Sequence, residues 1–227
     1  MTDPEILLRQ VPLFRSLRTE DTGRLAALLR RQTLHKGEVL CRKGEEGNTL
    51  YMIIAGKIKI VRQSRNGDEA ILAVLSAGDF CGEMALLDGL PRSADAFAVE
   101  DTSIYVLTRA DFFSCVVNNE RAVKTILSTL SKRLRNADDF LADIFFLNVS
   151  SRLVKKLLEL AENNGLPEED GGDIRLDITQ TTIAGMIGAT RESVNKELRV
   201  LREQGLIEVA EKKIMLIDVN KLRKKLL

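Results

Sequence analysis

The pattern of hydrophobic and polar residues changes along the chain and predicts distinct kinds of structure. Residues 5–32 hold two short helical patterns, and residues 33–109 break into short runs rich in Ile, Val, Leu and Tyr. Glycines separate these runs at Gly37, Gly44, Gly47, Gly56, Gly67, Gly78, Gly82 and Gly89. Short strands with turn residues between them predict an antiparallel β barrel or roll. The clearest hairpin turns at Asn66-Gly67, because both residues tolerate positive φ.

A long helical pattern follows, from Asp111 to about Leu147. Its apolar residues advance by alternating steps of three and four positions: Leu127, Leu130, Leu134, Ala137, Leu141 and Ile144. This spacing is a heptad seam, which is narrower than the stripe of a helix lying on a core. A core-packing helix can imitate such a seam over a short span. We expect the seam to pair two copies of the chain as a homodimer.

The seam is interrupted at Asn148-Val149-Ser150, which we interpret as a hinge. An amphipathic helix is expected over residues 152–160, followed by a loop at residues 163–172. A new module is expected from about Ile174 onward.

Residues 179–198 predict a helix, a tight turn and a second helix. Thr179 and Thr190 are favourable N-cap residues, and Gly188 suits the turn. The two helices share an apolar face made by Ile183, Ile187, Val194, Leu198 and Leu201. The opposite face of the second helix carries Arg191, Glu192, Asn195, Lys196 and Arg199. A helix-turn-helix places such a face in the major groove of DNA, although a plain αα corner has the same pattern.

Composition and charge exclude several classes of protein. The 227 residues carry 34 Lys and Arg against 33 Asp and Glu, and from Ser150 onward the counts are 14 and 13. Charge alone therefore indicates neither DNA nor a membrane surface as a partner. No run approaches the roughly 18 consecutive apolar residues of a membrane span, and the acidic N-terminus lacks an apolar signal core. We expect a cytoplasmic protein with no membrane partner.

Few residues are available for metal or catalytic chemistry. The cysteines Cys41, Cys81 and Cys115 are far apart in the sequence and are expected to be free buried thiols. With His35 as the single histidine, neither a His/Cys metal cluster nor a catalytic triad is expected. Only Glu83, Cys81 and His35 are candidates for a nucleophile or base. We therefore expect no catalytic residue, no metal and no enzyme.

The stretch Gly82–Ala94 holds the most informative candidate chemistry. Glu83 and Arg92 stand nine positions apart, and the guanidinium of an arginine is a fork of donors that suits a phosphate. The small residues Ser93 and Ala94 let backbone N–H groups approach the same anion. Glu83 can accept a hydrogen bond from a sugar hydroxyl. These residues predict a sugar-phosphate pocket, and the alternative is an ordinary surface ion pair beside a turn.

This stretch resembles the phosphate-binding cassette of cyclic-nucleotide-binding domains, which runs Gly-Glu-apolar-Ala/Ser-Leu, a short spacer and Pro-Arg-Ser/Ala-Ala. The resemblance implies that Glu83 binds the ribose 2′-hydroxyl and that Arg92 binds the cyclic phosphate. The other ligand-binding residues that it implies are Gly82, Met84, Ala85, Ser93 and Ala94. Cys81 departs from the Phe that the family often has, which affects packing more than ligand chemistry.

The segment Ile187–Lys196 resembles the recognition helix of the CRP/FNR family of bacterial transcription regulators. Residues 206–209 and 213–217 resemble the two strands of its wing. With the cassette, the long helix and the helix-turn-helix in that order, the resemblance covers nearly the whole chain. It implies an α+β fold of three parts: a cyclic-nucleotide-binding β-roll domain at 1–110, a dimerisation helix at 111–147 and a winged helix-turn-helix DNA-binding domain at 148–227.

The same resemblance implies how the chain binds a double-stranded DNA operator. Arg191, Glu192 and Lys196 are expected to reach base edges, and the phosphates are expected to be contacted by Gln180, Thr181 and Ser193. Arg pairs with guanine and Glu accepts from a cytosine amino group, whereas Lys196 lacks the fork of the Arg that several members have. We expect a palindrome with TGTGA-like half-sites about one helical turn apart, and RNA polymerase as a further partner.

The effector is less fully specified by the resemblance. In cAMP-responsive members a Thr and a following polar residue contact the adenine across the dimer, and Ala137 and Asp138 stand there in this chain. Ala137 cannot hydrogen-bond a base, whereas Asp138 can accept from one amino group. The expected effector is a cyclic nucleotide, with cAMP favoured, because Glu83 and Arg92 are both present. The alternatives are a different small effector, activity without a ligand, or a nucleotide-responsive subunit that controls a protein partner.

Overall fold

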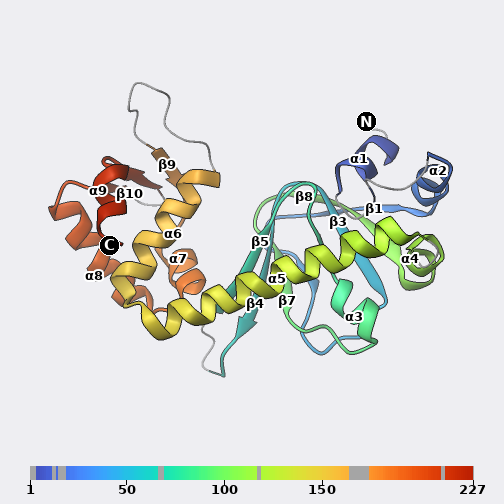
Figure 1. The fold of residues 1–227 in the computed structure, drawn as a ribbon, viewed down its shortest axis with the longest axis horizontal. Coiled ribbons are helices and arrows are strands. Elements are labelled where there is room, and N and C mark those ends of the chain that lie inside the picture. The colour runs from blue at the N-terminus through green and yellow to red at the C-terminus, as the bar shows by residue number, and fades with distance from the viewer. Residues whose placement is uncertain are drawn as a thin grey trace. The chain divides into compact units, whose positions relative to one another are not determined.

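The structure is a computed structural model that describes residues 4–11, 14, 19–65, 69–116, 119–163, 174–210 and 213–226 (Figure 1). The chain divides into two compact units. The first consists of Met1–Ser64 and Ile71–Leu134, and the second of Arg65–Ala70 and Arg135–Leu227. The predicted Asn66-Gly67 turn and the loop after residue 163 lie outside the described residues.

Two four-stranded antiparallel sheets form the roll of the first unit. One sheet has the order β1-β8-β3-β6, with these strands at Arg30–Leu34, Thr102–Thr108, Thr49–Ala55 and Phe80–Cys81. The other has the order β2-β7-β4-β5, at Val39–Cys41, Asp95–Ala98, Ile58–Gln63 and Glu69–Leu75. Every strand pair whose register is described is antiparallel. The predicted antiparallel roll is confirmed, and β4 and β5 of the predicted hairpin are neighbours in it.

Two apolar clusters hold the first unit together. Residues from both sheets meet in one cluster, which consists of Leu34, Ile53, Ile58, Leu75, Cys81, Ala96, Ala98 and Ile104. The other, here called the helical cluster, joins β3, β6 and β8 to α1 (Pro4–Gln10), α2 (Thr19–Leu28), α3 (Glu83–Asp88), α4 (Arg109–Val116) and the start of α5 (Glu120–Phe146). Each large aliphatic side chain contributes about 1.5–3 kcal/mol when fully buried, so this cluster fixes the helices against the roll.

The long helical pattern forms two helices rather than one. α4 ends at Val116, and α5 begins at Glu120. Asn119 precedes α5, and its Oδ1 accepts a hydrogen bond from the backbone N–H of Ala122 at 3.0 Å. The prediction of a single helix from Asp111 is therefore wrong, because an Asn side chain caps a new helix start.

α5 carries apolar residues on two faces. Ala122 and Ile126 are buried in the helical cluster, and Leu130 packs partly against it. The assignment of Leu130 to a free seam is thus wrong in part, since helical spacing places it near the buried face. Other residues of the predicted seam are exposed, with exposed fractions of 59, 64 and 55% at Leu127, Leu134 and Leu141.

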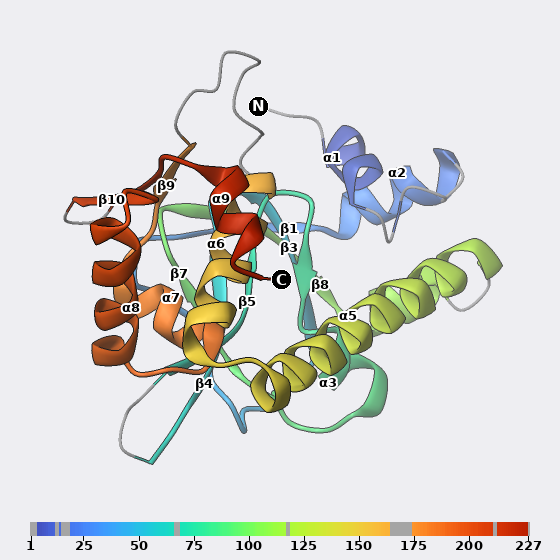
Figure 2. The same ribbon diagram turned by 60° about the vertical axis from the view of Figure 1, so that its left-hand side comes forward.

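The second unit combines helices with a small sheet (Figure 2). Its helices are α6 (Val149–Asn163), α7 (Gln180–Ile187), α8 (Arg191–Glu203) and α9 (Val219–Lys224). An antiparallel sheet has the order β10-β11-β9, with these strands at Ile207–Ala210, Lys213–Leu216 and Ile174–Asp177. The two predicted wing strands are confirmed as β10 and β11. The strand β9 and the helix α9 are elements that the sequence pattern did not indicate.

Hydrogen-bonded caps define the helix-turn-helix of the second unit. The hydroxyl of Thr179 accepts from the backbone N–H of Thr182 at 3.1 Å, and that of Thr190 accepts from Ser193 at 3.2 Å. Gly188 ends α7 with a φ of +61°, a conformation that favours glycine. The predicted apolar face is buried at Ile183, Ile187, Val194, Leu198 and Leu201. The predicted helix, turn and helix are confirmed.

The helix after the predicted hinge begins earlier than the pattern indicated. Asn148 accepts a hydrogen bond at Oδ1 from the backbone N–H of Ser151 at 2.9 Å, so α6 starts at Val149 rather than at Arg152. Its residues Leu153 and Leu157 are fully buried in the core of the second unit.

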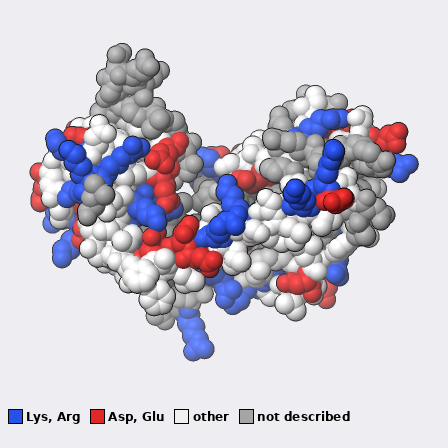
Figure 3. All heavy atoms as spheres, viewed as in Figure 1, with Lys and Arg blue, Asp and Glu red and all other residues white. Residues whose placement is uncertain are grey.

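Charged residues of both signs are interspersed on the face of the molecule in Figure 3. This distribution agrees with the formal net charge of +1. Among the described residues, no helix combines the length and apolarity needed to cross a bilayer.

Candidate functional site

The short helix α3 (Glu83–Asp88) positions the first half of the predicted cassette. Gly82 precedes it with a φ of +90°, in the left-handed region. A Cβ atom at this position would stand 2.5 Å from Nη1 of Arg92 and 2.7 Å from the carbonyl oxygen of Thr49. Glycine is therefore needed here both for its backbone conformation and for the passage of the Arg92 side chain.

Arg92 is buried, with 5% of its surface exposed. Its Nη1 donates to the carbonyl of Gly82 at 3.1 Å, and its Nη2 donates to the carbonyl and the hydroxyl of Thr49, both at 2.8 Å. The guanidinium also lies 5.0 Å from the ring centroid of Tyr51, a cation–π contact. These groups hold the guanidinium in one place, and all of them are neutral.

The positive charge of Arg92 lacks a compensating anion. Within the described part of the chain no carboxylate forms an ion pair with it, and its Nε is buried without a hydrogen-bond partner. A buried charge without a counterion costs several kcal/mol. The site is therefore suited to receive an anion next to Arg92.

Glu83 is buried as well, with 4% of its surface exposed. Its Oε1 accepts a hydrogen bond from Nη1 of Arg133 on α5 at 2.5 Å. Nη2 of Arg133 donates to the carbonyl of Phe80 at 2.6 Å, and the guanidinium lies 4.9 Å from the Phe80 ring centroid. Arg133 thereby joins the long helix to the start of α3.

The other predicted ligand-binding residues differ in exposure. Ala85 and Ala94 are buried, whereas Met84 and Ser93 are exposed. The hydroxyl of Ser93 lies 3.6 Å from Sδ of Met84, and the Ser93 carbonyl accepts from Nη1 of Arg62 at 2.9 Å. The first unit thus brings the predicted residues from Gly82 to Ala94 together around Arg92.

Asp138 and Ala137 lie on the part of α5 that belongs to the second unit, and both are exposed. Each has a side chain that solvent can reach. The contact of Asp138 with an effector stays a prediction.

Two cysteines lie near these charges as free thiols. Burial raises the pKa of Cys81, with Glu83 adding to the effect and Arg133 and Arg92 opposing it. Burial likewise raises the pKa of Cys41, which is half-buried. Both thiols therefore stay protonated and weakly nucleophilic at neutral pH. The side chain of Cys115 lies outside the described residues.

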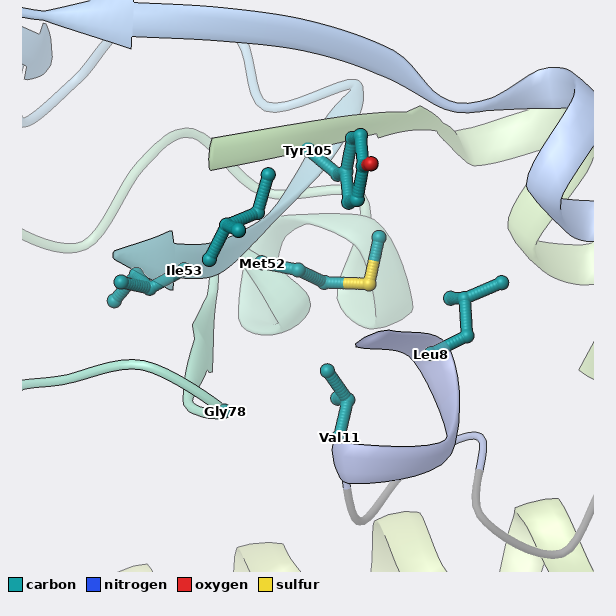
Figure 4. A pocket seen from close by; sticks show the side chains of 7 residues that line it. Leu8, Val11, Met52, Ile53, Gly78 and Tyr105 are labelled. Carbon is teal, nitrogen blue, oxygen red and sulfur yellow. The ribbon is translucent and has the colours of Figure 1, made fainter. Parts of the chain in front are cut away.

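A separate hollow lies between α1 and the strands β3 and β8 (Figure 4). Its volume is about 10 Å³, and its lining is apolar around Leu8, Val11, Met52 and Tyr105. That volume corresponds to about one water molecule. This hollow is too small for a nucleotide and is a packing defect of the helical cluster.

The predicted DNA-contacting residues lie on α7 and α8 of the second unit. Arg191, Glu192 and Lys196 are exposed on the first turns of α8, opposite its buried Val194 and Leu198. The three predicted phosphate contacts are also at the surface or partly so: Gln180, Thr181 and Ser193. Gln180 is the first residue of α7 and shares a surface hollow with side chains of α8.

Sequence reasoning missed three residues that shape the cassette. Thr49 and Tyr51 hold Arg92 from a strand more than 40 positions earlier, and no local pattern indicates this contact. The third, Arg133, lies on the long helix, outside the cassette motif. Its spacing of seven residues from Ile126 places it on the same side of α5, but only the structure shows that Ile126 is buried.

Two family models match separate parts of the chain. Residues 31–119 match the cyclic nucleotide-binding domain, and residues 151–225 match the Crp-like helix-turn-helix domain. These ranges contain the Arg92 site and the α7–α8 pair.

Known proteins are similar to this chain over most of its length. The CRP-like cAMP-activated global transcriptional regulator of Mycobacterium tuberculosis is 31% identical over 221 residues, covering 96% of this chain and 98% of that protein. The cyclic AMP receptor protein of Thermus thermophilus is 31% identical over 198 residues, covering 87% and 88%. A solved structure of the c-di-GMP responsive global regulator CLP of Xanthomonas campestris has a TM-score of 0.79 at 22% identity. That match covers 88% of this chain and 100% of the other, and it shows a shared fold.

Proposed function

Because this chain belongs to the CRP/FNR family of transcription regulators, we propose that it is a homodimer whose affinity for a DNA operator is controlled by a cyclic nucleotide. It is a CRP-like DNA-binding regulator with a cyclic nucleotide-binding domain, and the family is not one of enzymes. The proposal adds the effector, with cAMP favoured, the TGTGA-like palindrome and the dimer. We also propose that the protein acts in the cytoplasm and that RNA polymerase is a further partner.

The buried, uncompensated charge of Arg92 is the observation that carries the effector proposal. A cyclic phosphate would supply the missing anion and an acceptor for the unpartnered Nε. Arg133 occupies Oε1 of Glu83, which leaves Oε2 to accept from the ribose 2′-hydroxyl. Two relatives that are 31% identical over most of the chain carry cAMP in their names, which supports cAMP as the first candidate.

A different effector, or activity without one, is the second candidate. The side chain of Ala137 offers no hydrogen bond to a base, and the carboxylate of Asp138 offers only acceptors. Glu83 and Arg92 are also both held by protein groups. The phosphate and ribose ends of the site are thus compatible with several nucleotides, while the base end differs from that of cAMP-responsive members.

The dimer is supported by apolar residues on α5 that are exposed in a single chain. Leu127, Leu134 and Leu141 recur at intervals of seven residues, as at one position of a heptad. A second copy of α5 would cover them. A two-fold dimer would also present two copies of α8 to a palindromic operator.

Isothermal titration calorimetry with cAMP and a panel of other cyclic nucleotides tests the effector. We expect wild-type protein to bind and Arg92→Leu to give no binding heat, because the phosphate loses the buried cation that holds it. Arg31→Leu removes an exposed arginine of β1 and serves as the matched control, which should bind like wild type. Arg92→Lys keeps the charge without the fork and should bind more weakly. An unchanged titration of folded Arg92→Leu would refute the cassette assignment.

Operator selection tests the DNA-binding residues. Glu192→Ala should relax the preference at one base pair of each half-site by about 1–3 kcal/mol, because a base contact is lost. Binding to a set of singly substituted palindromes, measured by fluorescence anisotropy, reports that preference. Glu203→Ala, at the exposed end of the same helix, is the control. An unaltered base preference in Glu192→Ala would remove Glu192 from its role.

A further inference from the structure

A polar hollow of about 220 Å³ opens in the second unit between α8, the start of α7 and β10. It is lined by Gln180, Asn195, Leu198, Arg199, Arg202 and Val209. Two of these side chains are guanidinium groups, two are amides, and none is a carboxylate. The hollow therefore has the composition of an anion site.

The two arginines have no counterion among the residues that the structure describes. Arg199 and Arg202 are exposed, and within the described residues neither forms an ion pair. Together with Asn195 they are spaced by four and three residues, so they lie along one face of α8. Their positive charges are thus concentrated on the side of the helix that faces the hollow.

The neighbouring acids do not line the hollow. Val209 faces it, so the adjacent Glu208 projects from the opposite side of β10. Glu203 stands four residues after Arg199 on α8, but it is not part of the lining and forms no ion pair with Arg199. Asp177, on β9, pairs with Arg175 at 3.0 Å.

The side-chain amide of Asn195 also lacks a hydrogen-bond partner for its oxygen among the described residues. This oxygen, Oδ1, is buried. A water molecule that bridges this oxygen to a bound oxyanion would satisfy it, as waters do in protein–DNA interfaces.

We propose that this hollow seats a phosphate of the DNA backbone, held by Arg199 and Arg202. The inference rests on the proposed function, since DNA is the partner. The hollow adjoins the face of α8 that carries Arg191, Glu192 and Lys196, so it would flank the bases that they read. A phosphate held there fixes the register of α8 on the duplex without reading sequence.

The salt dependence of DNA binding tests this assignment in the full-length protein. Binding of a TGTGA palindrome and of a scrambled duplex is measured by fluorescence anisotropy between 50 and 200 mM salt. Each lost phosphate contact lowers the slope of log K against log salt by about 0.9, which removes about 3.5-fold of the affinity loss over this range. We expect Arg202→Gln and Arg199→Gln each to lower the slope by about 0.9 for each subunit bound. The decrease should be equal on the palindrome and on the scrambled duplex.

Two further variants complete the test. Arg202→Lys keeps the charge and should keep the wild-type slope. Arg175→Gln removes an exposed arginine on β9, outside the hollow, and should also keep it. Circular dichroism confirms that each variant is folded, and Arg199→Gln provides a second measurement if Arg202→Gln does not fold.

The outcomes separate this inference from the proposed function. Wild-type slopes in both Gln variants, with operator preference intact, would overturn the phosphate site and leave the regulator as proposed. A changed base preference in Arg202→Gln would also overturn it, because the residue would then read sequence. Equal binding of wild type to both duplexes would instead refute the proposed operator, while the slope still reports on the phosphate contact.

Discussion

Arg92, Glu83 and Arg133 form a charged group in which two guanidiniums accompany one carboxylate. Glu83 is neutralised by Arg133, whereas Arg92 has only neutral acceptors. The two arginines therefore have different roles, although both lie near Cys81. Arg133 stabilises the protein without a ligand, and Arg92 keeps a charge available for one.

Loss of Arg133 should destabilise the first unit. In Arg133→Gln the buried carboxylate of Glu83 has no counterion, and we expect a loss of about 1–3 kcal/mol in the free energy of unfolding. The value lies below that of a fully buried pair because 36% of the Arg133 side chain is exposed and water screens it. Urea denaturation measures the effect, and the double variant with Glu83→Gln should recover part of it. Arg135→Gln, on the exposed side of the same helix, should change stability by less than about 0.5 kcal/mol.

At the scale of elements, short polar side chains set the starts of several helices. Asn119, Asn148, Thr179 and Thr190 each accept a backbone hydrogen bond at the start of a helix. The cap at Thr190 has a functional consequence, because the first turn of α8 carries the residues expected to read bases. Its position depends on a hydrogen bond from Ser193 to a single hydroxyl.

Thr190→Ala should weaken the start of α8. We expect the second unit to lose about 1 kcal/mol of stability, because the N-cap hydrogen bond is absent. Operator affinity should fall as well, since Arg191 and Glu192 would be less ordered. Thr190→Ser keeps the hydroxyl and should restore both properties, as measured by thermal denaturation and anisotropy. Wild-type stability and affinity in Thr190→Ala would contradict this role of the cap.

At the scale of the whole molecule, α5 is the element whose exposed face a single chain does not account for. Its first turns are buried against the helical cluster, but its later turns expose several large apolar side chains, among them Leu134, Leu141, Phe145 and Phe146. Phe145 and Phe146 are 79% and 84% exposed. An apolar surface of this kind is typical of an interface, and a second copy of the helix has the matching repeat.

A charge in the seam should separate the proposed dimer. Leu134→Glu places like charges next to each other in a parallel pair, and we expect the protein to sediment as a monomer in analytical ultracentrifugation. Its affinity for the palindrome should fall, because the two half-sites would be bound independently. Ile6→Glu introduces the same charge at a similarly exposed residue on α1 and should leave the dimer intact. A dimer that persists in Leu134→Glu would place the interface elsewhere.

The sequence by itself determined the features that depend on neighbouring residues. Alternating short runs and glycines predicted the roll, and two Thr caps around Gly188 predicted α7 and α8, because periodicity and capping act within a few residues. The cassette motif likewise identified Glu83 and Arg92, which stand nine positions apart in one short stretch. The helix boundaries were predicted less accurately from the sequence, because Asn119 caps a second helix within the stretch that the pattern presented as one helix.

Only the tertiary structure decided which distant groups meet. Arg92 is seated by Thr49 across 43 positions, and Glu83 is paired with Arg133 across 50. Leu130, a residue of the predicted seam, packs partly against the helical cluster instead. Such contacts follow from how sheets and helices pack, which depends on complementary surfaces of the folded chain rather than on any local spacing. The sequence thus named Glu83 and Arg92, whereas folding brought Arg133 to Glu83 and left Arg92 without a counterion among the described residues.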